Sequence, residues 1–266
     1  MGESRREMKL GMFFAPGGHH LAAWRHPDAY PVGFDFGSYV EAARTAERGC
    51  FDMLFVADVF SLTPSGIFTI QRTLEGAKAF YAGIKAKAAA SGRDPRHALV
   101  LPGVLPYVGR SRQEAQDKHD RLLALIHPEA GLANLSKMMD VDLMGSDVEK
   151  PFPALDIAKL TQSRAVGIVE DARRDGLNIR QVYERLVVSK GHRQIVGTAS
   201  DIADNLQEWF EAGACDGYNV MPPMMPNGLD DFVELVVPEL QRRGLFRTAY
   251  RGRTLRDHLD LPRPAG

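Results

Sequence analysis

The stretch FGSYVEAARTAERGCFDMLFVAD, residues 36–58, joins an amphipathic segment to a short apolar one. Apolar residues recur at helical spacing in its first part, at Phe36, Val40, Ala43 and Ala46. Gly49 follows where a left-handed C-terminal cap is expected, so we predict a helix over 36–49. Residues 51–58 then predict a buried strand, and the apolar run at 8–14 predicts another before the helix. Strand, loop, helix and strand in this order is the unit of a parallel α/β fold.

The same unit recurs along the chain. We expect further strands at 67–70, 98–108 and 218–222, and further helices at 72–92, 111–126, 199–213 and 230–244. Ser111 and Glu114 have capping-box spacing at the start of one helix, and Pro102 and Pro106 are expected to break one strand. AERGCFDMLFV and FEAGACDGYNV repeat one pattern of helix, glycine, cysteine, aspartate and strand.

The number of strands falls short of a closed barrel. A complete eight-stranded β/α barrel takes about 250 residues, but residues 111–194 read as helix or loop and supply no strand. We therefore predict a single α/β domain over residues 1–266. It would be a partial (β/α) TIM-type barrel of about five parallel strands with a mostly helical insertion at 111–194.

Composition excludes several classes of function. The formal net charge is −1, with 44% hydrophobic and 25% charged residues, which argues against a nucleic-acid or membrane-surface partner. No stretch reaches the apolar length of a membrane span, and the first residues lack the pattern of a secretory signal. Two cysteines, Cys50 and Cys215, cannot build a disulfide framework. We expect buried structural thiols and a cytoplasmic protein.

The loop PGGHHLAAWRHPDA, residues 16–29, follows the first strand at the end where β/α barrels place their chemistry. One interpretation is a metal site made of His19, His20, His26 and Asp28. Adjacent histidines do not easily point at one ion, and no second ligand cluster follows on a later strand, so no metal is expected. A pocket wall and a polar loop anchored by Trp24 remain as alternatives.

This loop, with YVEAARTAERGCFDMLFVAD after it and VGTASDIADNLQEWFEAGACDGYNVMPP near the end, resembles the bacterial-luciferase-like flavin monooxygenases. The nitrilotriacetate monooxygenase component A branch is the most similar. The resemblance implies a β/α barrel that uses reduced FMN, supplied by a separate flavin reductase, to oxidise a small organic substrate with O2.

The resemblance also implies roles for individual residues. His19, His20 and Trp24 would be catalytic, beside the flavin ring or the substrate. Ala57 and Asp58 would contact FMN, although Asp58 also suits an N-cap or turn. Arg25 and Met221 would contact substrate, although packing of the loop explains Met221 equally well.

The chain departs from the family near residues 59–66, where a full-length relative has strands three to five. By the resemblance, residues 8–14, 51–57, 67–70, 98–105 and 217–221 would be strands one, two, six, seven and eight. These five are neighbours in a closed barrel, so one contiguous sheet would remain. Its bare edges favour a homo-oligomer or cover from the insertion.

Two alternatives to an active monooxygenase stay open. The first is a non-catalytic, internally deleted remnant that does not bind flavin. A metal-dependent hydrolase on a barrel is the second, to be distinguished by metal content.

Overall fold

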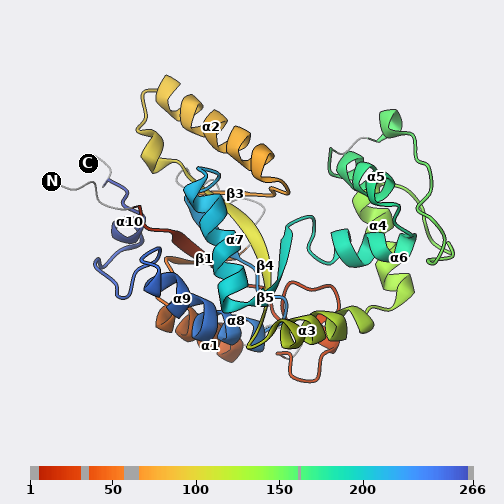
Figure 1. Cartoon of the computed structure of the whole chain (residues 1–266), viewed down its shortest axis with the longest axis horizontal. Coiled ribbons are helices and arrows are strands. Elements are labelled where there is room, and N and C mark those ends of the chain that lie inside the picture. Colours follow the sequence, from red (N-terminus) through yellow and green to blue (C-terminus); the bar gives the residue numbers. More distant parts are fainter. Residues whose placement is uncertain (1–5, 31–35, 57–65, 161–162, 263–266) are drawn as a thin grey trace.

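Six parallel strands form one sheet in the computed structural model, which describes residues 6–30, 36–56, 66–160 and 163–262 (Figure 1). The strands are β1 (Lys9–Phe13), β2 (Met53–Phe55), β3 (Gly66–Thr69), β4 (Leu99–Gly109), β5 (Arg193–Thr198) and β6 (Gly217–Val220). Their order is β2-β1-β6-β4-β3, with β5 paired to β4. This order confirms that the strands expected as six, seven, eight, one and two remain neighbours.

One strand more than expected is present. β5 was missed because its sequence, RQIVGT, opens with two polar residues and most of it is only half-buried. β4 is continuous over 11 residues, so the prediction that Pro102 and Pro106 break it was wrong. β4 changes partners along its length, since pairing with β3 ends at Pro102 and pairing with β5 begins at Val104. A proline therefore removes one donor without ending the strand.

Helices connect the strands and cover the outer face of the sheet. They are α1 (Phe36–Arg48), α2 (Leu74–Ala90), α3 (Arg112–Ala124), α4 (Pro128–Met139), α5 (Ser163–Asp175), α6 (Ile179–Val182), α7 (Ala199–Glu211), α8 (Asn227–Asp231), α9 (Val237–Arg242) and α10 (Leu255–His258). A π-helical segment, Phe232–Val236, joins α8 to α9. The main core combines residues of β1, β4 and β6 with residues of α1, α7 and α8–α9.

The expected helix-end signals at Ser111 and Gly49 are each met only in part. The Ser111 hydroxyl accepts from the Glu114 N–H as expected, whereas the Glu114 carboxylate accepts from Arg110 N–H. The left-handed residue after α1 is Cys50, with φ of 55°, and not Gly49. Gly49 is required for packing instead, because a Cβ there would lie 2.9 Å from Val233 Cγ2.

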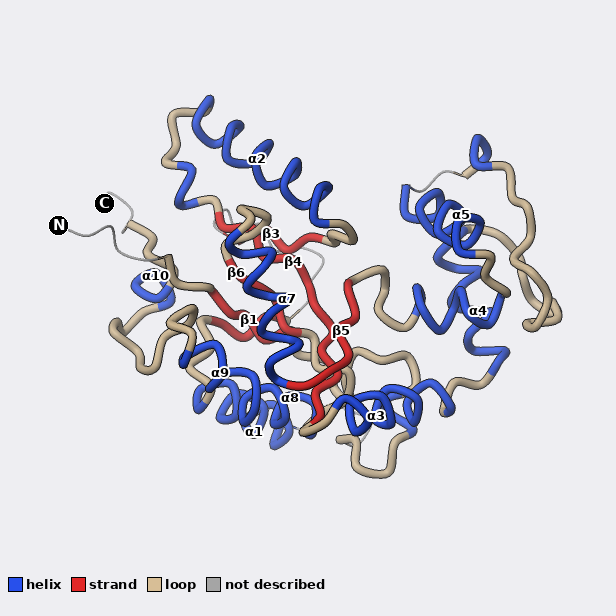
Figure 2. Tube along the Cα trace, viewed as in Figure 1, coloured by secondary structure: helices blue, strands red, loops and turns tan. Residues whose placement is uncertain are grey.

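The insertion forms a helical lobe with a core of its own. α4, α5 and α6 pack together around Leu135, Ile168 and Tyr183, and they stand to one side of the sheet in Figure 2. Ala22, in the loop after β1, belongs to the same core. The lobe therefore contacts the loop that carries the expected site. Within the described part of the chain, no helix is long and apolar enough to cross a bilayer.

A buried ion pair fixes the amino ends of β1 and β2. The Asp52 carboxylate accepts from the Arg247 guanidinium and, at 2.7 Å, from Leu10 N–H. The Asp52 side chain is 0% exposed and that of Arg247 is 5% exposed. Burial is the largest influence on the pKa of Asp52 and raises it to about 6, against the lowering effect of Arg247.

Candidate functional site

Two loops run side by side at the carboxyl ends of β1 and β6. His19 N–H donates to Pro222 O at 2.9 Å, and His20 N–H donates to Pro223 O at 2.9 Å. Gly18 makes this approach possible, because it has a φ of 113° and a Cβ there would lie 2.4 Å from Met224 Cα. The pairing turns the first two histidines of the loop inward, and each is only 3% exposed.

His19 presents a hydrogen-bond acceptor to the interior of the half-barrel. Its Nε2 lies 2.9 Å from Phe13 O and donates to it in the neutral ring, which leaves Nδ1 as the acceptor. Nδ1 is buried and has no partner among the described residues. Burial lowers the pKa of His19 to about 4. The imidazole is therefore neutral at physiological pH.

His20 has the opposite arrangement. Its Nδ1 accepts from Ala22 N–H at 3.1 Å, so Nε2 carries the proton. Nε2 is buried without a partner in the described residues. Burial lowers the pKa of His20 to about 3. His19 and His20 thus leave one unpaired acceptor and one unpaired donor in buried positions, which is typical of functional sites.

Asn219 and His192 also reach the interior, and sequence reasoning missed both. Asn219 is a polar residue inside the buried strand β6, with its Oδ1 unpartnered in the described chain. Gly11 of β1 makes room for it, because a Cβ there would lie 2.8 Å from Asn219 Oδ1. Gly103 of β4 likewise makes room for His192, because a Cβ there would lie 2.4 Å from His192 Nδ1. A polar residue and glycines within apolar strands were the available signals.

Three phenylalanines fill the space between the edge strands. Phe13 of β1, Phe55 of β2 and Phe68 of β3 form this interior aromatic cluster, with ring centroids 4.9 to 5.5 Å apart. His19 packs on Phe13 at 4.4 Å, and His192 stacks on Phe68 at 4.9 Å. The cluster joins the two histidines and brings β2 and β3 together across the interior.

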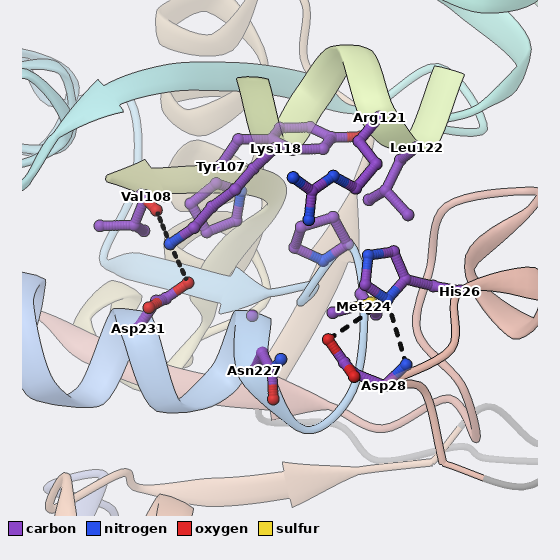
Figure 3. Close-up of a pocket in the computed structure, with 13 residues that line it drawn as sticks. His26, Asp28, Tyr107, Val108, Lys118, Arg121, Leu122, Met224, Asn227 and Asp231 are labelled. Atoms are coloured by element: carbon purple, nitrogen blue, oxygen red, sulfur yellow. Dashed lines mark hydrogen bonds and ion pairs between the residues drawn. The ribbon is translucent and has the colours of Figure 1, made fainter. Parts of the chain in front are cut away.

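A small cavity lies beside these loops, between α3 and the end of β4 (Figure 3). Its volume is about 110 Å³. Tyr107 contributes a buried hydroxyl without a described partner, and burial raises the pKa of that hydroxyl. Lys118 donates to Asp231 at 2.8 Å and to Val108 O at 2.9 Å. Small-molecule sites take roughly 300–1,000 Å³, so this cavity is too small for a flavin.

Trp24 and Arg25 do not join this group. Trp24 is 59% exposed. Arg25 donates to Leu125 O at 2.6 Å and so ties the loop to the insertion. Met221 is buried, with its sulfur near Gly103, so it does reach the interior. Ala57 and Asp58 lie outside the described residues.

No metal centre is formed by the residues that the structure describes. No three His, Cys, Asp or Glu side chains among them gather closely enough to hold an ion. His26 and Asp28 approach one another at 3.8 Å, but His19 and His20 point to different partners. The metal-dependent hydrolase interpretation therefore has no support in this part of the chain.

The interior offers polar groups that suit a flavin, but it does not offer the space. His19 Nδ1 and Asn219 Oδ1 would accept from N–H groups on the edge of a reduced flavin ring. The interior aromatic cluster fills the region between β2 and β3. In this arrangement the described residues do not fit FMN.

The fold and the position of the site define the class: a partial β/α barrel with its polar residues at the carboxyl ends of the strands. The chain is 42% identical over 242 residues to nitrilotriacetate monooxygenase component A of Aminobacter aminovorans, which covers 90% of this chain and 50% of that one. It is also 42% identical over 205 residues to N-acetyl-S-(2-succino)cysteine monooxygenase of Bacillus subtilis, covering 76% of this chain and 46% of the relative. It belongs to the luciferase-like flavin monooxygenase family and spans about half the length of the curated relatives it matches.

Solved structures agree on the fold. DmoA from Hyphomicrobium sulfonivorans superimposes with a TM-score of 0.65 at 23% identity, over 77% of this chain and 45% of that one. EDTA monooxygenase from Chelativorans sp. BNC1 superimposes with a TM-score of 0.55 at 29% identity, over 79% of this chain and 51% of that one. No family model matches the chain. The expected partial barrel is thus confirmed.

Proposed function

We propose that this chain serves a two-component, FMN-dependent monooxygenation of a small organic substrate with O2. Reduced FMN would come from a separate flavin reductase. The observation that carries the proposal is the group of buried polar atoms on His19, His20 and Asn219 that have no partner among the described residues. They lie at the carboxyl ends of strands in a chain 42% identical to nitrilotriacetate monooxygenase component A.

The interior aromatic cluster fills the region between β2 and β3, so a flavin ring could enter there only if the cluster moved. We propose that the chain is internally shortened near residues 59–66 and that Asp58, Ala57, Arg25 and Met221 keep their expected contacts with cofactor and substrate. The match spans 50% of the length of nitrilotriacetate monooxygenase component A, which supports this shortening.

A titration with FMN and with reduced FMN, followed by flavin fluorescence and absorbance, tests the proposal. Phe55→Ala/Phe68→Ala removes two rings of the cluster and should bind flavin more tightly than the natural chain. Adding His19→Ala to that variant should weaken binding again. If neither the natural chain nor Phe55→Ala/Phe68→Ala binds flavin at high concentration, the monooxygenase proposal is wrong.

The aromatic cluster also favours a second candidate, a non-catalytic remnant of the family that folds without flavin. It predicts that opening the interior changes stability alone and leaves flavin binding absent.

We propose a cytoplasmic location and a homo-oligomer for this chain. Cys50 and Cys215 are free thiols, which suits a cytoplasmic protein. Leu54 and Val56, at the β2 edge, are 38% and 49% exposed, which supports a homo-oligomer that covers this edge. Sedimentation of the natural chain and of Leu54→Lys would test it, with loss of the oligomer expected in the variant.

A further inference from the structure

A cavity of about 390 Å³ lies where the end of β3 and the start of β5 meet the insertion. Four arginines line this arginine pocket: Arg72, Arg174, Arg185 and Arg193. One carboxylate, Asp171, lines it with them. Its volume falls in the range of roughly 300–1,000 Å³ that small-molecule sites occupy.

The arginines come from separate elements that the fold brings together. Arg72 follows β3 and donates to Asp171 of α5 at 2.7 Å. Gly167 of α5 allows this approach, because a Cβ there would lie 2.9 Å from Arg72 Nη1. Arg185 lies in the π-helical segment Tyr183–Val187 before β5, and Arg193 is the first residue of β5.

The positive charge exceeds what a structural ion-pair network needs. Asp175 pairs with Arg174 at 2.8 Å and with Arg185 at 2.6 Å. Asp171 pairs with Arg72 and Arg174. Two carboxylates thus pair with three of the four guanidinium groups, Arg72, Arg174 and Arg185, and a guanidinium stays charged in proteins.

Arg193 is the clearest sign of the excess. Its guanidinium lies 3.5 Å above the Trp209 ring, and Nη1 donates to Asn205 Oδ1 at 2.8 Å. Its Nε and Nη2 are buried, and neither has a hydrogen-bond partner in the described ranges. Thr73, the N-cap of the 17-residue helix α2, also lines the pocket, so the positive end of the helix dipole adds to the field.

We propose that the arginine pocket binds a small anion with several carboxylate or phosphate oxygens. Arginine matches both groups through paired N–H donors. His192 lines the pocket and also stacks on Phe68 of the interior, so the anion would sit beside the candidate site. A role as substrate site rests on the proposed monooxygenase function, whereas the binding of the anion does not.

Binding is tested by calorimetric titration of the full chain with citrate and with inorganic phosphate. Saturable binding is expected, and it should weaken as salt rises. Arg174→Gln/Arg185→Gln, at side chains 64% and 55% exposed, should bind at least tenfold more weakly, roughly the loss of a charge-assisted pair. Arg185→Lys keeps the charge and loses the paired geometry, so it should weaken binding while the melting temperature stays unchanged.

The matched control is Arg112→Gln/Arg242→Gln, two exposed arginines that pair with Asp201 and Glu239 outside the pocket. It should bind like the natural chain. Absence of saturable binding at millimolar citrate and phosphate, or equal weakening in the control, overturns the proposal.

Two flavins separate the sources of the anion. If FMN displaces citrate and riboflavin does not, the pocket takes the flavin phosphate. If FMN binds without displacing citrate, the pocket is separate from the flavin phosphate and suits the carboxylates of a substrate. Citrate binding without any flavin binding would support the pocket and count against the monooxygenase function.

Discussion

Replacing Arg247 by methionine should destabilise the fold in a pH-dependent way. The substitution removes the positive partner of Asp52, whose side chain is 0% exposed. Breaking a buried pair from one side costs about 3–5 kcal/mol while the remaining charge stays ionised. The loss should therefore be of this size at pH 8.

At pH 5 the loss should be smaller, about 1–2 kcal/mol, the usual range for lost packing. Burial raises the pKa of Asp52 from 3.8 to about 6, so ionisation of Asp52 weakens the folded state. The preference of the folded state for a neutral Asp52 carboxyl contributes about 3 kcal/mol of stability below pH 4. This contribution is lost as pH rises through about 6. Without Arg247 the pKa rises further, and at pH 5 Asp52 is neutral and needs no counter-charge.

Urea denaturation followed by circular dichroism at both pH values measures the effect. Arg242→Met is the control: that arginine is 71% exposed and pairs with Glu239, so its replacement should leave the stability close to that of the natural chain at both pH values. Asp52→Asn/Arg247→Met should be more stable than Arg247→Met alone at pH 8, because no buried charge remains. Equal losses at pH 5 and pH 8 for Arg247→Met would refute the reasoning.

Two further predictions concern the interior. Gly103→Ala should lower stability by about 1–3 kcal/mol because its methyl group would meet His192 at 2.4 Å. In the control Gly66→Ala, the methyl group meets no described atom within 4 Å, so this variant should melt like the natural chain. Equal melting of both variants would contradict the described packing. In a histidine NMR titration, His19 and His20 should remain neutral until pH falls below 5, since burial lowers their pKa values to about 4 and about 3. Their contribution to stability is present above pH 6.5 and is lost as pH falls toward those values, and titration of either ring near pH 6.5 would show that it is exposed.

The neutral state of His19 and His20 bears on any chemistry at this site. A neutral imidazole with a pKa near 4 accepts or donates a hydrogen bond, but it does not store a proton at pH 7. The two rings therefore position groups rather than supply charge. The charge lies in the arginine pocket, which His192 also lines.

The sequence by itself determined most elements of the fold, and the order of five strands followed from the resemblance to the family. Short apolar runs between amphipathic helices are local patterns, and burial on both faces of a parallel sheet keeps them apolar. The position of His19 and His20 after β1 followed from the same pattern. The polar strand β5 was missed because its pairing with β4 decides its conformation.

Only the tertiary structure decided which residues meet. Asn219 and His192 face the interior because Gly11 and Gly103 lie opposite them on neighbouring strands. Asp52 and Arg247 are 195 residues apart in the chain, and the residues of the arginine pocket come from the stretches 72–73, 171–174 and 185–195 and from Asn205. Such contacts depend on strand register and on the packing of the insertion. No local pattern of residues encodes either of these.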